Sequence, residues 1–288
     1  MKSHSPRPRP HFRPRPRPSS SSSNLNSNSN DSRTKDEGRG RGRKTEDEDE
    51  RKELRVVLIT GAAGGLGRGL VSAFAGQGWR VVAACHRITP PWPGERIWTV
   101  LLDVTDRPAT AQTVKSIMER FGRIDVLVNN AGITLDQPVW QLDEAAWQAV
   151  IDVNLKGAFL CSQAVLPAMR QVRDGYILNV ASQVGRRGAR GQASYAASKA
   201  GLLGLTQSLA REEGCHNIRV NAVMPGLLPT GMTAHLAKDQ MKAMIAANVL
   251  GRANSLDEVA GFIVFLAGMQ SVSGQCFQLD SRVGSWVA

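Results

Sequence analysis

The sequence contains few cysteines, and they lie far apart. Cys85, Cys161, Cys215 and Cys276 form no Cys-x-x-Cys pair and have no histidine at ligand spacing. This spacing argues against a metal site and against a disulfide framework. We therefore expect a metal-free chain that works in a reducing compartment.

Long hydrophobic runs are also missing. No stretch of the sequence approaches the roughly 18 apolar residues of a membrane span, and the N-terminus lacks the apolar core of a secretory signal. We therefore expect a soluble, cytoplasmic protein without a membrane partner. The alternative is the matrix of a plastid or mitochondrion, because residues 1–30 are basic, rich in serine and free of acidic residues, like a transit peptide. The arginine–proline repeats in residues 7–18 argue against the amphipathic helix of such a peptide.

The first 53 residues contain no apolar run. They consist of arginine–proline repeats, a serine and asparagine tract and a segment of mixed charge. Such a composition buries too little apolar surface to offset the cost of ordering the chain, so we predict a disordered extension over residues 1–53. Residues 54–288 have the length of a single α/β domain. The net charge of +11 is divided between both parts, and this scattered charge makes nucleic acid an unlikely partner.

The remainder of the chain alternates short apolar runs with longer helical patterns. Strands are expected at residues 55–60, 80–85, 97–102, 124–129, 176–181, 218–223 and 275–279. Helices are expected near residues 65–76, 107–121, 143–170, 193–213 and 255–267, with a proline-rich loop or a single turn between residues 87 and 97. Strands that are apolar on both faces and separated by helices predict a doubly wound, Rossmann-like parallel sheet of seven strands.

A glycine-rich loop follows the first expected strand and opens the first helix. Its candidate cofactor-binding residues are Thr60, Gly61, Gly65, Leu66 and Gly67. Glycines at this place let backbone N–H groups and the helix N-terminus approach a pyrophosphate, although glycines also simply end strands. The second expected strand ends in Cys85-His86-Arg87, where a carboxylate would bind the ribose 2′-hydroxyl of NAD. Because cations replace that carboxylate, NADP(H) is favoured, with Arg87 as its ligand; the alternative is that Arg87 points into solvent.

Tyr195 and Lys199 are spaced to act together. A spacing of four residues places both side chains on one face of a helix, one turn apart. An ammonium group beside a phenol favours the phenolate, so we expect Lys199 to lower the pKa of Tyr195 and to make it an acid–base catalyst. The pair alone is a weak signal, because exposed helices also carry such neighbours.

Further motifs make the pair specific, and together they resemble the short-chain dehydrogenase/reductase family over residues 54–280. They occur in that family's order: the glycine loop, Asp103-Val104, Asn129-Asn130-Ala131-Gly132, Asn154, Ser182, Tyr195 with Lys199, and Pro225-Gly226 with Thr230. Ser182 stands 13 residues before Tyr195, as the family requires. The resemblance implies an NAD(P)-dependent oxidoreductase.

The resemblance also implies roles for these residues. Tyr195 would donate the proton, Lys199 would also hold the nicotinamide ribose, and Ser182 would bind the substrate carbonyl. Asn154 would hold a water that relays protons to Lys199; alternatively it is a helix asparagine bonded to the backbone. Asp103 and Val104 would contact the adenine, although Asp103 could be only a turn or capping residue. Cofactor support is implied for Asn130, Ala131 and Gly132, and a cover over the nicotinamide for Pro225, Gly226 and Thr230. Thr134 and Asp136 are expected to be loop residues.

Several segments resemble one branch of the family, the 3-oxoacyl-acyl-carrier-protein reductases of fatty acid or polyketide-type synthesis. This branch implies an acyl-carrier-bound substrate, a homotetramer and carrier-binding cations at the positions of Arg173 and His216, of which only Arg173 is a firm cation. Gly231 and Asp280-Ser281-Arg282 depart from the family pattern. Two alternatives remain: a reductase of another carbonyl, such as a free ketone, sugar, steroid, quinone or pterin, and a non-enzymatic nucleotide sensor. Residues 227–244 would form the lid that selects the substrate.

Overall fold

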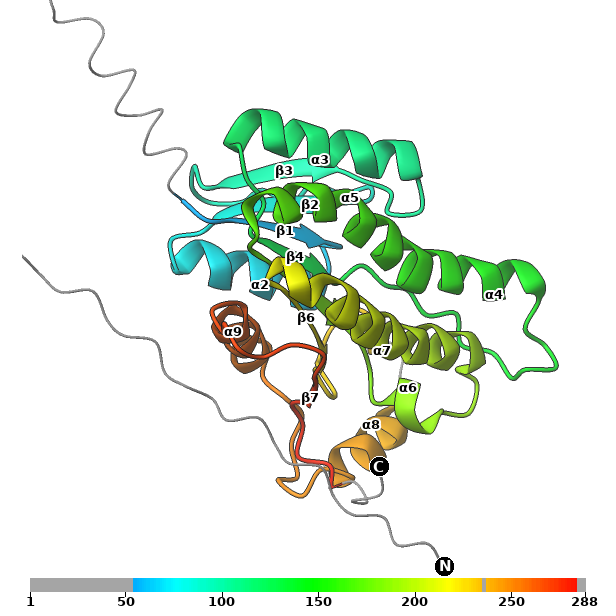
Figure 1. The fold of residues 1–288 in the computed structure, drawn as a ribbon. Coiled ribbons are helices and arrows are strands. Elements are labelled where there is room, and N and C mark those ends of the chain that lie inside the picture. The colour runs from blue at the N-terminus through cyan, green and yellow to red at the C-terminus, as the bar shows by residue number, and fades with distance from the viewer. Residues whose placement is uncertain (1–53, 235–236, 284–288) are drawn as a thin grey trace, which may run out of the picture. The chain divides into compact units, whose positions relative to one another are not determined.

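The structure is a computed structural model that describes residues 54–234 and 237–283. The predicted disorder of residues 1–53, and with it the domain boundary at residue 54, lies outside these described ranges. Within them, the chain forms a parallel sheet of seven strands with helices on both faces (Figure 1). The doubly wound fold class predicted from the sequence is confirmed.

The strands lie within two residues of their predicted positions. They are β1 Val56–Thr60, β2 Arg80–Cys85, β3 Ile97–Leu101, β4 Val126–Asn129, β5 Gly175–Val180, β6 Ile218–Met224 and β7 Cys276–Gln278. Their order across the sheet is β3-β2-β1-β4-β5-β6-β7, and every neighbouring pair is parallel. The order reverses between β1 and β4, where ligands of doubly wound sheets bind.

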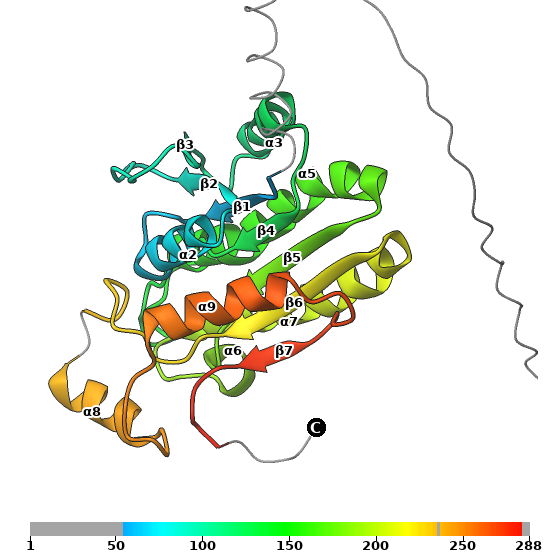
Figure 2. The same cartoon turned by 90° about the vertical axis from the view of Figure 1, so that its left-hand side faces the viewer.

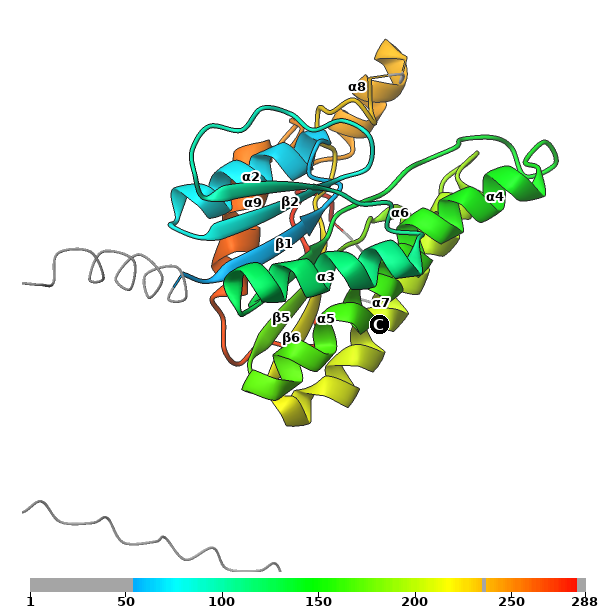
Figure 3. The ribbon, with the colours of Figure 1, turned by 90° about the horizontal axis from the view of Figure 1, so that it is seen from above.

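Each face of the sheet has its own layer of helices. Val57 and Ile59 of β1 pack with α2 (Gly65–Gly76) and α9 (Leu256–Ala267). Val56 and Leu58 point to the opposite face, because successive side chains of a strand alternate. That face is covered by α3 (Arg107–Phe121), α5 (Gly157–Val172) and α7 (Ala193–Glu213), as Figures 2 and 3 show.

The helix predicted over residues 143–170 contains an irregularity that the sequence does not reveal. It runs as α4 (Glu144–Ile151), a π-helical segment η1 (Asp152–Lys156) and α5. By length and composition the run Glu144–Val172 could cross a membrane, but 50% of its apolar window is buried within the protein. This burial is typical of a helix that packs in the core of a protein.

Three further short helices were not predicted, namely α6 (Val184–Arg187), η2 (Gly214–His216) and α8 (Lys238–Ala246). The proline-rich stretch between β2 and β3 is a loop, as predicted from its prolines.

A chain of buried hydrogen bonds crosses the middle of the sheet. Asn129 Nδ2 donates to Ser162 Oγ of α5 (3.1 Å) and to Asn179 Oδ1 of β5 (2.9 Å). Asn179 Nδ2 in turn donates to Thr206 Oγ1 of α7 (2.9 Å). Buried amides need such partners, and here they join α5, β4, β5 and α7 into one rigid unit. This unit supports the helix that carries Tyr195.

Candidate active site

The predicted site residues gather at the carboxyl ends of the strands. The glycine loop follows β1, Asn130 to Gly132 follow β4, Ser182 follows β5 and Pro225 follows β6. In parallel sheets these ends meet at one edge, so residues far apart in sequence converge on a common surface.

The loops after β1 and β4 approach more closely than side chains would allow. Gly61 has a φ of +63°, and a Cβ added to it would lie 2.7 Å from Ala131 Cα. A Cβ on Gly67 would lie 2.3 Å from the Gly61 carbonyl oxygen. Both positions therefore require glycine for the close contact itself.

Thr60 and Asn130 hold these two loops together. The backbone N–H groups of Asn130 and Ala131 both donate to Thr60 Oγ1, at 3.1 Å. Asn130 Nδ2 donates to the carbonyl oxygens of Thr60 (2.9 Å) and Gly61 (3.1 Å). These predicted cofactor residues thus brace one another and fix the shape of the loop.

The N-terminus of α2 fits a pyrophosphate. Its N-cap, Gly64, makes no side-chain capping hydrogen bond, and the first turn, all of it described, contains no acidic residue. Backbone N–H groups without partners and the positive end of the helix dipole favour an anion there. A Cβ on Gly65 would lie 2.6 Å from Thr230 Cγ2, so the loop after β6 reaches the glycine loop.

Two arginines and a histidine lie near the end of β2. Arg87 is exposed, and its predicted contact with the cofactor stays a prediction. Arg68, in the first turn of α2, is also exposed. Burial raises the pKa of the Cys85 thiol, and the nearby charge of Arg68 reduces this rise. Arg68 was not among the predicted site residues, although a cation in the first turn of a helix is unusual and is a signal in the sequence.

Asp103 forms a turn and faces this group of cations. Its Oδ1 accepts hydrogen bonds from Thr105 N (2.9 Å) and Thr105 Oγ1 (2.8 Å). Its Oδ2 lies 3.5 Å from His86 Nε2. The Thr105 N–H is the main cause that lowers the pKa of Asp103, with smaller contributions from His86 and Arg87. Val104 is buried against Gly157, the first residue of α5.

Lys199 is buried beside Tyr195 on α7. Its Nζ donates to the Val180 carbonyl oxygen at the end of β5 (2.7 Å) and lies 5.6 Å from the centre of the Tyr195 ring. Burial lowers the pKa of Lys199 to about 8. A buried ammonium bonded to a carbonyl is costly to maintain, which is typical of functional sites.

The pKa of Tyr195 lies above its ordinary value. Burial raises it, the carboxylate of Asp136 raises it further, and a hydrogen bond with Ser182 opposes both. The spacing of Tyr195 and Lys199 in the sequence could not predict this burial. The expected lowering of this pKa by the Lys199 ammonium stays a prediction.

Asn154 lies in the π-helical segment η1 and is buried. Its Oδ1 accepts from the Ile133 N–H (2.8 Å), while its Nδ2 donates to the Ile133 carbonyl (2.9 Å) and to Ser198 Oγ (3.0 Å). Both amide atoms therefore bond to the protein, as in the alternative interpretation. Since Ser198 Oγ donates to the Tyr195 carbonyl (2.8 Å), Asn154 connects the loop after β4 with the helix of Tyr195.

Gly185 brings Ser182 to Tyr195 and Lys199. A Cβ on Gly185 would lie 2.7 Å from the Ala200 nitrogen and 3.0 Å from Lys199 Cβ, so α6 packs directly against α7. Ser182 Oγ accepts from the Val184 N–H (3.2 Å), which fixes the turn that leads into α6. The sequence gives no signal for Gly185, because its role depends on a contact between two helices.

The loop after β6 is tied to the end of β7. Gly226 has a φ of +79°, and a Cβ on it would lie 2.5 Å from Asp280 Cβ. Asn254 Nδ2 donates to the carbonyls of Pro225 (2.7 Å) and Leu279 (2.9 Å). The side chain of Asp280, the first residue of the segment Asp280-Ser281-Arg282, is buried and paired with Arg282. Asn254 was not predicted as part of the site.

Asp136 bonds to the beginning of α7. Gln192 Nε2 donates to Asp136 Oδ2 (2.8 Å), the Thr134 hydroxyl bonds to the same carboxylate, and Gln137 N donates to the Gly191 carbonyl (2.8 Å). Asp136 is thus more than a loop residue, because it fixes the turn two residues before the helix of Tyr195.

Arg173 and His216 lie away from the site. Arg173 ends α5 just before β5 begins, and its Nη2 donates to the Cys215 carbonyl (2.7 Å). Both residues are therefore at the amino ends of the strands, opposite to Ser182 and Tyr195. Among the described residues, no group of three or more His, Cys, Asp or Glu side chains could hold a metal ion.

Comparisons of the sequence with known proteins identify relatives of this chain. The family model for short chain dehydrogenase matches residues 55–241. The chain is 43% identical over 241 residues to the 3-oxoacyl-[acyl-carrier-protein] reductase FabG of Thermotoga maritima, covering 80% of this chain and 98% of that protein. It is 37% identical over 235 residues to FabG of Escherichia coli, covering 79% and 96%. It is 38% identical over 239 residues to a 3-oxoacyl-[acyl-carrier-protein] reductase of Synechocystis sp., covering 78% and 95%.

Proposed function

Because this chain belongs to the short-chain dehydrogenase family, and so is an NAD(P)-dependent oxidoreductase, we propose that it reduces the ketone of 3-oxoacyl thioesters with NADPH. The observation that carries the proposal is the 43% identity to a reductase of that name over 98% of its length. The proposed substrate is the thioester bound to an acyl carrier protein.

The glycine loop, the N-terminus of α2 and the Pro225–Thr230 loop would hold the dinucleotide, and the glycines let the first two approach its pyrophosphate. When bound, the cofactor supplies the hydride. The remaining chemistry belongs to side chains of this protein.

Tyr195 would donate the proton to the substrate oxygen. Because burial and Asp136 raise its pKa, the phenol keeps its proton at neutral pH and is available as an acid. Ser182 would donate a hydrogen bond to the same oxygen as negative charge develops there. Lys199, buried and positively charged below pH of about 8, would stabilise the phenolate that remains after the transfer. Asn154 would hold the helix of Tyr195 in register with the loop after β4.

The preference for NADPH is proposed from the cations near the end of β2. Arg68 and Arg87 are exposed near Cys85 and Asp103, respectively, where a 2′-phosphate would need charge compensation. Replacing both by glutamine should raise the KM for NADPH about tenfold or more and leave that for NADH nearly unchanged. Equal changes for both cofactors would contradict the assignment.

The proposed lid has two parts with different roles. Leu227 and Leu228 are only 4% and 6% exposed, so they belong to the protein core. Met232 is 42% exposed and is available to an acyl chain. This apolar exposed residue favours a greasy substrate over a sugar.

The deciding experiment is a turnover assay of the purified full chain. NADPH and NADH would be tested with acetoacetyl thioesters of an acyl carrier protein, of coenzyme A and of N-acetylcysteamine, beside free ketones, quinones and sugars. The proposal predicts NADPH oxidation with the thioesters. Activity on another carbonyl alone would replace the substrate assignment, and no turnover with any carbonyl would favour the nucleotide-sensor alternative.

The proposal includes a homotetramer in the cytoplasm, by analogy with the family. Light scattering on the full chain measures the mass directly, and microscopy of a C-terminally tagged chain distinguishes the cytoplasm from an organelle matrix.

A further inference from the structure

We propose that Arg186, Arg187 and Arg190, which we name the arginine rim, form a docking surface for the acidic carrier protein that delivers the thioester. This inference rests on the proposed function and assigns carrier binding to residues outside the positions that the family resemblance indicates.

The arginine rim is part of the segment that joins Ser182 to Tyr195. Arg186 and Arg187 end the short helix α6, and Arg190 precedes the turn at Gly191, which has a φ of +80°. Gly185 fixes the beginning of this segment on α7, and the bond between Gln137 N and the Gly191 carbonyl fixes its end. The three cations therefore lie on a segment that is anchored at both ends and that joins two proposed catalytic residues.

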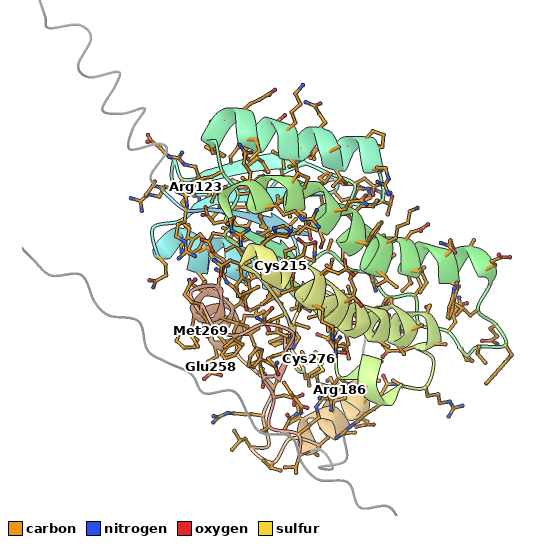
Figure 4. All side chains as sticks on the ribbon, viewed as in Figure 1. Arg123, Arg186, Cys215, Glu258, Met269 and Cys276 are labelled. Atoms are coloured by element: carbon orange, nitrogen blue, oxygen red, sulfur yellow. The ribbon has the colours of Figure 1, made fainter. Side chains whose placement is uncertain are left out.

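The arginine rim is an exposed group of positive charges. All three side chains are exposed, and none forms an ion pair with a carboxylate of the described residues. Arg186 is near enough to Cys276 to counteract part of the rise in the pKa of that thiol, which burial causes. Figure 4 labels both residues. Asp136, on the other side of Gly191, is already bonded to Gln192 and Thr134. Three exposed cations in five residues create a local positive potential at the site.

Because the arginine rim is exposed, its expected partner is an acidic protein surface and not a single phosphate group. A phosphate site requires donors that converge on one buried point, whereas these side chains extend from a short exposed helix and turn. Spread charges of one sign instead steer a partner of opposite charge and accelerate its association.

The arginine rim is also better placed than Arg173. Arg173 precedes β5 and Ser182 follows it, so the length of a six-residue strand separates that arginine from the reaction site of the same protomer. At about 3.3 Å per residue this is about 20 Å. A carrier on the arginine rim would lie at the site edge itself.

The test compares a triple variant, R186Q/R187Q/R190Q, with the wild-type full chain on three acetoacetyl thioesters. With the carrier protein as donor, kcat/KM should fall about tenfold or more at low salt, mainly through KM, and its salt dependence should weaken. With the uncharged N-acetylcysteamine thioester, kcat/KM should not change. Arg211→Gln, an exposed arginine in the last turn of α7, is the matched control and should leave all three reactions unchanged.

Each other outcome has a defined meaning. An equal loss with the carrier and N-acetylcysteamine thioesters would overturn the proposal, because it would show damage to the site. An equal loss of kcat/KM with the carrier and coenzyme A thioesters would show that the arginine rim recognises phosphate and not a protein surface. An unchanged variant would refute the arginine rim alone, whereas a wild-type chain that reduces no thioester would refute the proposed function.

Discussion

The positively charged side chains at the two edges of the sheet have different partners. At the amino edge three arginines pair with carboxylates: Arg123 with Asp125, Arg170 with Glu213 and Arg219 with Asp174. Arg55 there lies 4.0 Å over the Trp79 ring, and Arg173 bonds to the Cys215 carbonyl. At the carboxyl edge Lys199 bonds to a carbonyl, and the arginine rim has no carboxylate partner among described residues. Two pairs at this edge are exceptions: Arg282 with Asp280, after β7, and His86 beside Asp103, after β2. We infer that the charged side chains of the amino edge stabilise the fold, whereas those of the carboxyl edge are available to bind ligands.

The largest expected effect belongs to the carboxyl edge. Tyr195→Phe should lower kcat roughly 10²- to 10⁴-fold, because it removes the proton donor, and change the free energy of unfolding by about 1 kcal/mol or less. Tyr176→Phe is the matched control, because the Tyr176 hydroxyl is buried and accepts from Asn221 Nδ2 (2.6 Å). The control should lose stability and keep its kcat. Turnover and urea unfolding measure both, and similar kcat values for the two variants would contradict the role of Tyr195.

The amino edge should show the opposite pattern. Asp125→Asn should lower the free energy of unfolding by about 3 kcal/mol, since it breaks a largely buried ion pair and weakens the bond to Val56 N (2.7 Å), while kcat stays unchanged. Glu119→Gln, which removes the exposed partner of Lys115, should cost less than about 1 kcal/mol. A large loss of kcat in folded Asp125→Asn would show that the two edges are coupled.

Lys199 should make the carboxyl edge a source of instability at neutral pH. Its pKa falls from 10.5 to about 8 on folding, so between these values the unfolded chain binds more protons and the wild type gains stability as pH rises. Lys199→Met lacks this titration. Its free energy of unfolding relative to the wild type should therefore fall by on the order of 3 kcal/mol between pH 7 and 10.5, as urea unfolding across this range would measure. If the difference in free energy of unfolding between the two proteins did not change with pH, the pKa of Lys199 would not be lowered in the folded protein.

The smallest expected effect is a shift in the titration of the Tyr195 phenol. Asp136→Asn keeps an oxygen for Gln192 but removes the negative charge that raises the pKa of Tyr195, so phenolate should form at lower pH. The chain has only two tyrosines, and the difference spectrum against Tyr195→Phe isolates this phenolate in the near ultraviolet. No shift, or a shift to higher pH, would show that Asp136 acts only through the turn at Gln192.

The fold was readable from the sequence because its signals are local. Strand positions followed from runs such as residues 56–60, and the order of motifs indicated the family. The missed elements depend on tertiary contacts: the π-helical segment around Asn154, the packing of Gly185 on α7 and the position of Arg68. The upward shift of the Tyr195 pKa could not be predicted for the same reason, since burial is a property of the folded chain. The predicted roles of the site residues stay predictions.

The buried asparagines also bear on how the strands find their alignment. Parallel strands that are apolar on both faces give similar contacts in several registers. Here Asn129 lies opposite Asn179 and bonds to it, while Asn221 of β6 reaches the Tyr176 hydroxyl of β5. A slip of one residue would bury these polar groups without partners, at a cost of about 1 to 3 kcal/mol each. The same bonds that support the helix of Tyr195 therefore select the one alignment of β4, β5 and β6 in which the chain can complete its folding.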